Sequence, residues 1–428
     1  MGKYSIKAKW RQRSFQAVIS CSSLFLLLLT ASLSRCTSDD SSELSDIIGN
    51  SAGPTVKASP TYTINAGGSG DDCTEGQDSN DLTCEEAYPA PTDIKYGEGI
   101  AYKIQGVTIV KYSKDLNLHI YYPINDESTS RPAFMFIHGG SFLNGNKDKY
   151  DIRKMAHYFA RRGWVYISID YRTGERDIFP HYNSVPDFSV PTDLPYYTKI
   201  VPYQWARPSY LNAVAAHPLT LDRTRRAGIA MYPAQRDAKA ALRWLVANAE
   251  TYNINKDYIT VGGHSAGAIT AVTLGVSNHE DFRDELRADN EAGDPEDSTL
   301  ETTNLHQTYS VRSIVNFWGG PVKLDNFHLF NSIAETSADY RFDSNDPELF
   351  TAHGTSDPNS FTPPPRHEVH NPANDNLIHA IYTDLGIYNE YIPLVNKGHD
   401  AWDATVDGKS LFKLAFDFLV ERQGLQVE

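Results

Sequence analysis

The sequence predicts an α/β protein with a mostly parallel central β-sheet that helices cover on both faces. Two observations carry this prediction. Continuous apolar runs, such as residues 133–137 and 164–171, are typical of strands buried on both faces. Between such runs, apolar residues recur at helical spacing, as they do across residues 152–160. Strands that alternate with helices of this length pair in parallel, because each helix carries the chain back along the sheet.

The individual elements follow from the same two patterns, taken along the chain. We expect β-rich runs at 100–112 and 116–122, a strand at 133–137, a helix around 152–160 and a strand at 164–171. After a long interruption we expect a helix around 238–245, a strand at 258–261, a helix at 268–276, strands at 311–318, 349–353 and 388–395, and a closing helix around 411–419.

Composition excludes several classes of protein. The 428 residues include 39 basic and 54 acidic ones, for a net charge of −15, whereas nucleic-acid-binding proteins present a basic face. The 25 Tyr, 18 Phe and 6 Trp supply too much buriable surface for a disordered chain. Four cysteines are too few for a disulfide scaffold, and a single terminal apolar run excludes a polytopic membrane protein.

Residues 1–36 have the pattern of an export signal. Basic residues precede an apolar stretch centred on residues 24–29, small residues follow, and no acid appears before Asp39. The stretch is short for a membrane span, so we expect an exported protein that is secreted, periplasmic or held at the cell surface; an uncleaved anchor is the alternative. Residues 33–36 (Leu-Ser-Arg-Cys) are similar to a bacterial lipoprotein cleavage box except at Arg35, so a lipid on Cys36 would provide membrane anchoring.

Residues 37–98 are rich in Ser, Gly, Asp and Pro and carry 13 acids against Lys57 and Lys95. Such a composition buries too little apolar area to offset the entropy of ordering, so we expect an acidic flexible tether. Cys73 and Cys84 lie within it, and in an oxidising compartment we expect them to pair with each other rather than bind a metal. The catalytic domain is therefore expected at residues 99–428.

Residues 263–267 read Gly-His-Ser-Ala-Gly and fit the Gly-x-Ser-x-Gly pattern. The pattern lies between an expected strand and an expected helix, which is the place of a nucleophile elbow. Flanking glycines are needed there because the turn is strained and leaves no room for side chains beside the serine. We interpret Ser265 as a nucleophile; an ordinary strand-to-helix turn is the alternative.

A second glycine motif, His138-Gly139-Gly140, follows the earlier buried strand. Glycines there let backbone N–H groups approach a reacting carbonyl oxygen. Together with the N–H of Ala266, the amides of Gly139 and Gly140 are expected to form an oxyanion hole. A Gly-Gly turn that only ends a strand is the alternative.

Two strand ends provide candidates for the general base and its acidic partner. His399 follows the last expected strand and comes after the serine in the chain, where the base of a Ser–His–acid arrangement must lie. Asp357 also follows a strand, so its carboxyl group is expected at the same sheet edge. Asp346 precedes that strand and would point to the opposite edge. Asp400 and Asp403 adjoin the histidine, and loop neighbours seldom face its ring nitrogen.

The order Ser265, Asp357, His399 is the chain order of the α/β-hydrolases. With Phe-Ile-His-Gly-Gly-Ser-Phe at 136–142 and Gly-Gly-His-Ser-Ala-Gly at 262–267, residues 99–428 resemble the carboxylesterase and lipase branch of that superfamily, and most of all its hormone-sensitive-lipase-like esterases. The sequence departs from the pattern of these esterases at two positions, which bear on the subgroup and on the substrate. Ser141 stands where many relatives have a third glycine, and His264 stands where the closest subgroup commonly has Asp.

The resemblance implies the α/β-hydrolase fold and acyl transfer on a small-molecule or lipid-like ester, with no metal or cofactor. His399 would take the proton of Ser265 as its hydroxyl attacks an ester carbonyl, and Asp357 would orient the imidazole. The oxyanion donors would stabilise the negative charge that develops on the carbonyl oxygen.

A long insertion at about 174–231 separates an expected strand from the next expected helix. Its residues are rich in aromatics interleaved with prolines, and it leaves the sheet at the edge where the catalytic groups are expected. We interpret it as a cap over the substrate site, which would favour an apolar or aryl ester. A surface excursion that packs its own aromatic residues is the alternative.

Two other functions compete with the esterase hypothesis. An amidase or peptidase of the same fold would use the same three residues. A non-catalytic, hydrolase-like binding protein is the third possibility, although such proteins typically lose the serine or histidine, and here both are present.

Overall fold

The computed structural model describes residues 53–65, 88, 90–106, 108–178, 223–279, 282, 303–319, 342–357 and 378–428. The expected export signal, the cysteines Cys36, Cys73 and Cys84, and residues 179–222 of the insertion lie outside these residues, so the expectations for them remain predictions. Among the described helices, none is both long enough and apolar enough to cross a membrane.

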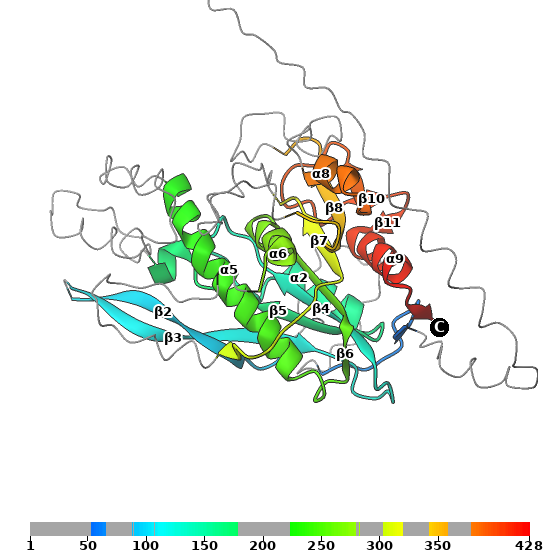
Figure 1. Ribbon diagram of the computed structural model, residues 1–428, viewed down its shortest axis with the longest axis horizontal. Helices are drawn as coiled ribbons and strands as arrows, with labels where there is room; N and C mark the ends of the chain where they lie inside the picture. Colours follow the sequence, from blue (N-terminus) through cyan, green and yellow to red (C-terminus); the bar gives the residue numbers. More distant parts are fainter. Residues whose placement is uncertain are drawn as a thin grey trace, which may run out of the picture. The chain divides into compact units, whose positions relative to one another are not determined.

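An eight-stranded sheet forms the centre of the described structure, in the order β2-β3-β5-β4-β6-β7-β8-β9 (Figure 1). The strands are β2 (Ile94–Gln105), β3 (Thr108–Tyr121), β4 (Arg131–Ile137), β5 (Val165–Ile169), β6 (Ile254–His264), β7 (Ser313–Phe317), β8 (Glu348–Gly354) and β9 (Asn389–Leu394). β2 pairs with β3 and β3 with β5 in antiparallel fashion, and every other neighbouring pair is parallel. The predicted mostly parallel sheet is confirmed.

Helices cover both faces of this sheet, also as predicted. They are α2 (Tyr150–Ala160), α5 (Arg223–Ala247), α6 (Ala266–Val276), α8 (Ile378–Asp384) and α9 (Leu411–Gln423), with a short π-helix η1 at Gly174–Ile178. Strand β4 shows how one strand serves two cores, because successive side chains point to opposite faces. Met135 and Ile137 join the core under α5 and α6, whereas Phe134 and Phe136 join the core under α2 and α9.

The structure differs from the sequence-based expectation at two places. The β-rich run at 100–112 is a hairpin rather than one strand, and it turns at Gly106, whose φ of 65° suits glycine. Helix α5 begins at Arg223 and continues through Pro233, so the end of the expected insertion at 174–231 belongs to this helix. Its buried Ala227 and Ala230 continue the apolar face, but alanines contribute little to a periodicity signal.

The prediction of a flexible tether over 37–98 is wrong at both of its described parts. Strand β1 (Thr55–Val56) pairs in parallel with β12 (Gln426–Val427) at the C-terminus, and Val56 is fully buried. Ile64 is also buried and forms a β-bridge to Pro123, and β2 begins at Ile94. A segment with the average composition of a disordered chain can thus be ordered by a few apolar side chains that pack into an existing core.

Asp346, rejected from the sequence as the catalytic acid, lies in the turn before β8, whereas Asp357 follows β8. Burial raises the pKa of the Asp346 carboxyl group to about 7, and the charge of the neighbouring Asp343 raises it further. The Asp343 N–H, which donates a hydrogen bond to Asp346 Oδ2, lowers this pKa. Because the pKa in the folded state exceeds the ordinary 3.8, this group stabilises the fold at low pH and loses that contribution as pH rises through about 7.

Asp346→Asn is therefore expected to raise the melting temperature above about pH 8 and to leave it nearly unchanged near pH 4. Thermal unfolding of the wild type and the variant at both pH values measures the difference. Asp384→Asn, at an exposed aspartate of α8, is the control for the substitution itself. An equal shift in melting temperature for Asp346→Asn at both pH values would contradict the raised pKa assigned to Asp346.

Candidate active site

Four strand ends meet at one edge of the sheet. Ser265 directly follows β6, Asp357 lies three residues after β8, His399 lies five residues after β9, and the His138-Gly139-Gly140 turn follows β4. These four strands are parallel, so their carboxyl ends share this edge. Ligands of open α/β sheets bind outside the carboxyl ends of the strands. The expected convergence of the sequence motifs is thus present.

Ser265 occupies a strained turn between β6 and α6. Its φ of 54° and ψ of −121° lie outside the regions that non-glycine residues ordinarily adopt, a conformation that costs on the order of 1–3 kcal/mol. The two flanking glycines permit the turn. A Cβ on Gly263 would lie 2.4 Å from the carbonyl carbon of Gly267, and a Cβ on Gly267 would lie 2.0 Å from the carbonyl oxygen of Ile137.

Gly267→Ala is expected to lower the free energy of unfolding by about 3 kcal/mol or more, because the new methyl group meets rigid backbone of β4 rather than a movable side chain. Chemical denaturation measures this loss. Gly408→Ala is the comparison. Gly408 has a φ of 76° but open space around its Cβ position, so this variant measures the cost of backbone strain without a steric clash. A variant at 267 no less stable than the one at 408 would contradict the packing argument.

Ser265, His399 and Asp357 form a continuous chain of hydrogen bonds. His399 Nε2 lies 2.8 Å from Ser265 Oγ, and His399 Nδ1 lies 2.8 Å from Asp357 Oδ2. The Asp357 side chain has no exposed surface, whereas that of His399 is partly exposed. A buried carboxylate on Nδ1 places the imidazole proton there, which leaves Nε2 free to accept the hydroxyl proton of Ser265.

A second histidine, which the sequence analysis missed, contacts the same carboxylate. His353 Nε2 lies 3.0 Å from Asp357 Oδ2, the oxygen that His399 also bonds, and the His353 side chain is 1% exposed. With its Nε2 proton, His353 donates a hydrogen bond that holds the carboxyl group in place. The available signal was the position of His353 at the end of β8, four residues before Asp357.

The structure contradicts one of the three expected oxyanion donors. The N–H of Gly139 donates to His264 Nε2 at 3.1 Å, so it is directed into the protein and away from the site of a reacting carbonyl oxygen. No acceptor is found among the described residues for the N–H groups of Gly140 and Ala266, or for that of Ser141. Ala266 is the first residue of α6, where amides lack intrahelical acceptors. Gly140 and Ala266 remain the expected donors.

The turn after β4 has an unusual backbone. Gly140, Ser141 and Phe142 follow one another with φ values of 125°, 57° and 63°. Ser141, which stands where many relatives have a third glycine, therefore adopts the left-handed region at a cost of roughly 1 kcal/mol. A Cβ on Gly140 would lie 2.1 Å from the carbonyl oxygen of Asn144, so only glycine fits there.

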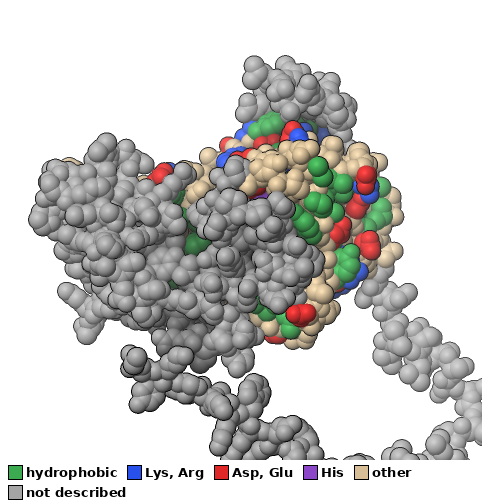
Figure 2. Space-filling model, turned by 90° about the horizontal axis from the view of Figure 1, so that it is seen from above, with side chains coloured by type: hydrophobic (Ala, Val, Ile, Leu, Met, Phe, Trp, Pro, Cys, Tyr) green, Lys and Arg blue, Asp and Glu red, His purple; other side chains and the backbone are tan. Residues whose placement is uncertain are grey.

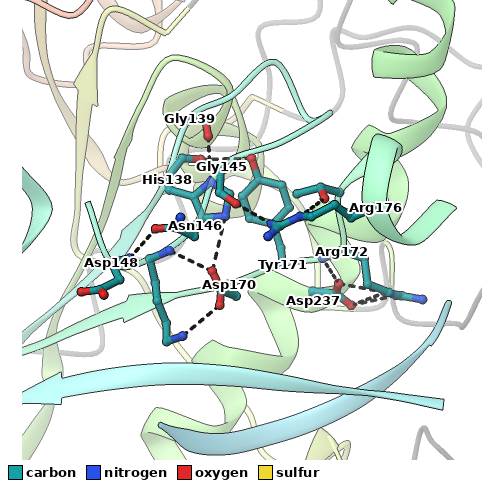
Figure 3. A network of polar contacts seen from close by, with 12 residues as sticks. His138, Gly139, Gly145, Asn146, Asp148, Asp170, Tyr171, Arg172, Arg176 and Asp237 are labelled. Carbon is teal, nitrogen blue, oxygen red and sulfur yellow. Dashed lines mark hydrogen bonds and ion pairs between the residues drawn. The ribbon is translucent and has the colours of Figure 1, made fainter. Parts of the chain in front are cut away.

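A network of polar contacts holds this turn (Figure 3). Tyr171 donates its hydroxyl proton to the His138 carbonyl at 3.1 Å, and the two rings stack with centroids 4.2 Å apart. The backbone N–H and the Nζ of Lys147 both bind Asp170, at 2.8 and 2.9 Å. Arg176 donates to the carbonyl of Gly145. Burial lowers the pKa of His138 to about 4, so its imidazole is neutral near pH 7.

A buried ion pair extends the network away from the turn. Arg172, just after β5, binds Asp237 of α5 through two nitrogens, with Nη2 to Oδ1 at 2.7 Å, and both side chains are fully buried. Burial by itself would raise the pKa of the Asp237 carboxyl group, but the Arg172 guanidinium outweighs it and the pKa lies below the ordinary value. Since the pair joins β5 to α5, it fixes the base of the insertion relative to the sheet.

On the part of the face in Figure 2 that the structure describes, acidic and basic side chains are scattered among apolar ones. Within the described ranges, no group of three or more His, Cys, Asp or Glu side chains is placed to hold a metal ion.

The parallel sheet, the strained serine turn and the Ser–His–Asp contacts define an α/β-hydrolase. A family model described as BD-FAE matches residues 118–187 and 223–360. Over these two segments, which make up just under half of the chain, the protein is similar to that family, and its fold is that of the α/β-hydrolases. The hormone-sensitive-lipase-like subgroup stays a prediction.

Solved structures with a similar fold include several forms of esterase 2 from Thermogutta terrifontis. Its apo form is 19% identical with a TM-score of 0.47, over 80% of this chain and 98% of that chain. The propionate-bound form is 19% identical with a TM-score of 0.46, over 79% and 96%. The form phosphorylated by paraoxon is 20% identical with a TM-score of 0.45, over 77% and 95%. No curated protein sequence matches the chain.

Proposed function

We propose that this protein is a serine carboxylic-ester hydrolase that works through an acyl-enzyme. The observation that carries the proposal is the unbroken contact from Ser265 Oγ to His399 Nε2 and from His399 Nδ1 to Asp357 Oδ2, each at 2.8 Å. A nucleophile, a base within hydrogen-bond reach and a buried group that orients the base are the three parts that covalent acyl transfer requires.

In the proposed reaction His399 Nε2 takes the proton of Ser265 as Oγ attacks the ester carbonyl carbon. The tetrahedral intermediate places its negative charge on the former carbonyl oxygen, where the N–H groups of Gly140 and Ala266 are the proposed donors, each worth about 3 kcal/mol of barrier. His399 then gives the proton to the leaving alcohol. Water, deprotonated by the same imidazole, releases the acid and restores the serine.

Asp357 stabilises the imidazolium that forms during both steps. Its carboxyl group is fully buried, so its attraction for the protonated ring of His399 is little screened by solvent. The contact from His353 limits rotation of the carboxyl group, which keeps Oδ2 in reach of His399 Nδ1.

The proposed substrate is a small-molecule or lipid-like ester with an apolar or aryl portion. Two observations support this choice. The sequence of the insertion at 179–222 is rich in Tyr, Phe and Trp. In the described part, Trp318 lies near His399, with ring centroids 6.5 Å apart. Apolar and aromatic side chains around a few polar groups are typical of small-molecule sites.

A series of p-nitrophenyl esters from acetate to laurate, assayed beside the matching p-nitroanilides, tests the proposal. Turnover of the esters with kcat/KM far above that of the anilides supports an esterase. Faster turnover of the anilides would identify an amidase, and absence of turnover on both series would favour a non-catalytic protein.

We also propose that the protein is exported, with residues 1–36 as the signal, and that Cys36 is its site of membrane anchoring if the cleavage box is used. The basic start, the apolar stretch and the delayed first acid support export. Intact mass and N-terminal sequencing of the protein from the producing cell test it. A chain that still begins at Met1 would contradict cleavage.

A further inference from the structure

His264 lies between the nucleophile and the oxyanion turn, and no step of the proposed reaction uses it. It is the last residue of β6 and directly precedes Ser265, and it is 1% exposed. Its ring stacks on Phe136 with centroids 6.0 Å apart and lies edge-on to Trp402 at 5.1 Å. These aromatic neighbours fix the plane of the imidazole, so the direction of its nitrogens is fixed as well.

Nε2 of this imidazole accepts the hydrogen bond from the N–H of Gly139, at 3.1 Å. An accepting Nε2 carries no proton, so the ring is neutral with its proton on Nδ1. Its surroundings favour the neutral ring. Burial lowers the pKa of His264 well below the ordinary value, and the positive charge of Lys149 lowers it further.

Gly139 and His264 also touch directly. A Cβ on Gly139 would lie 2.9 Å from His264 Nε2 and 2.8 Å from the His264 carbonyl oxygen. Glycine at 139 thus allows the turn after β4 to approach the end of β6 closely enough for the hydrogen bond. Just before this contact, the two strands pair in register at Ile137 and Gly263.

We propose that His264 is a positioning residue that sets the oxyanion turn relative to Ser265 by accepting the N–H of Gly139. The proposal rests on the proposed esterase function. Once Gly139 is tied to the residue before the nucleophile, the next amide, that of Gly140, has a fixed distance from Ser265 and from the first amide of α6 at Ala266. An oxyanion hole depends on such fixed donors, because they stabilise charge without having to reorganise.

The surroundings of residue 264 also suit a histidine better than an aspartate. The site is lined by Phe136, Trp318 and Trp402, and an isolated carboxylate there would be costly to bury. A neutral imidazole supplies an acceptor at much lower desolvation cost.

The test compares His264→Phe, which keeps the ring and removes the acceptor, with His264→Gln, whose Oε1 can replace Nε2. We expect His264→Phe to lower kcat on p-nitrophenyl acetate by about 10²-fold with KM within about twofold of wild type, as for a misplacement of about 1 Å. His264→Gln should recover most of the loss. His157→Gln, at a buried histidine of α2, is the matched control and should leave kcat unchanged.

A purely structural role would lower the melting temperature of both His264 variants without separating their kcat values. Equal kcat for the Phe and Gln variants, or a kcat for His264→Phe within about twofold of wild type, would overturn the proposal. If His264→Phe does not fold, His264→Leu takes its place in the comparison.

Amide hydrogen exchange at Gly139 separates this inference from the proposed function. The Gly139 N–H should be protected in the wild type and in His264→Gln and exchange faster in His264→Phe. A wild type without ester turnover would refute the esterase proposal, whereas fast exchange at Gly139 in an active wild type would refute only the role of His264.

Discussion

Replacement of Ser265 by alanine is expected to abolish ester turnover, with kcat at least about 10⁴-fold below wild type. The variant loses the nucleophile, so no acyl-enzyme can form, and what remains is the contribution of binding and of the oxyanion donors to attack by water. Because alanine is smaller than serine and Ser265 Oγ bonds only His399 among the described residues, the fold should be retained. Steady-state kinetics and thermal unfolding of the same preparation measure both properties.

Ser277→Ala is the matched control, because Ser277 caps the C-terminus of the same helix, α6. It should keep wild-type kcat. A Ser265→Ala protein that is folded and still hydrolyses esters within about tenfold of wild type would show that another group is the nucleophile.

Asp357→Asn is expected to lower kcat by about 10⁴-fold. The amide removes the negative charge that stabilises the imidazolium of His399. Its NH₂ group can also donate to Nδ1, which moves the ring proton to Nε2, where it blocks proton transfer from Ser265. The effect should fall mainly on kcat, since the Asp357 side chain is buried and contacts the reacting serine only through His399.

Asp400→Asn and Asp403→Asn test the two acids that adjoin His399 in the sequence. Both side chains are exposed, and Asp403 binds Lys397 at 2.7 Å rather than the imidazole. Neither variant should change kcat by more than about twofold. A loss in either that matches the loss in Asp357→Asn would contradict the assignment of the acid.

The positions of the three candidate catalytic residues could be predicted because each lies within five residues of the end of a recognisable strand. Parallel strands bring their carboxyl ends to one edge, so Ser265, Asp357 and His399 meet there despite their separation in the chain. The sheet and most helices could be predicted for a related reason, since buried parallel strands are continuous apolar runs.

The oxyanion turn shows what sequence patterns do not contain. The glycines predict a close backbone approach, which the structure has, but the direction of each N–H depends on dihedral angles and on partners from other strands. Gly139 faces His264 because β4 and β6 are neighbours in the sheet, and that pairing joins segments more than a hundred residues apart. The contact of His353 with Asp357 was not predicted, because the sequence alone leaves several possible partners for every histidine.

The prediction of a flexible tether at 37–98 failed for a different reason. A composition argument averages over the whole segment, whereas ordering depends on single side chains that find a core. Val56 and Ile64 are such side chains, and β12 provides the backbone partner for β1 from the other end of the chain. The hairpin at Gly106 was missed because both of its strands are β-rich, so the pattern continues through the turn.

Covalent labelling with a fluorophosphonate probe tests the central claim most directly, because the probe reacts with a serine hydroxyl only where a base activates it and donors hold the phosphoryl oxygen. We expect stoichiometric labelling, loss of esterase activity in proportion to it, and a modified peptide that contains Ser265. No labelling should occur in Ser265→Ala, and His399→Ala should react far more slowly. A label on another residue, or full ester turnover after complete labelling, would contradict the account.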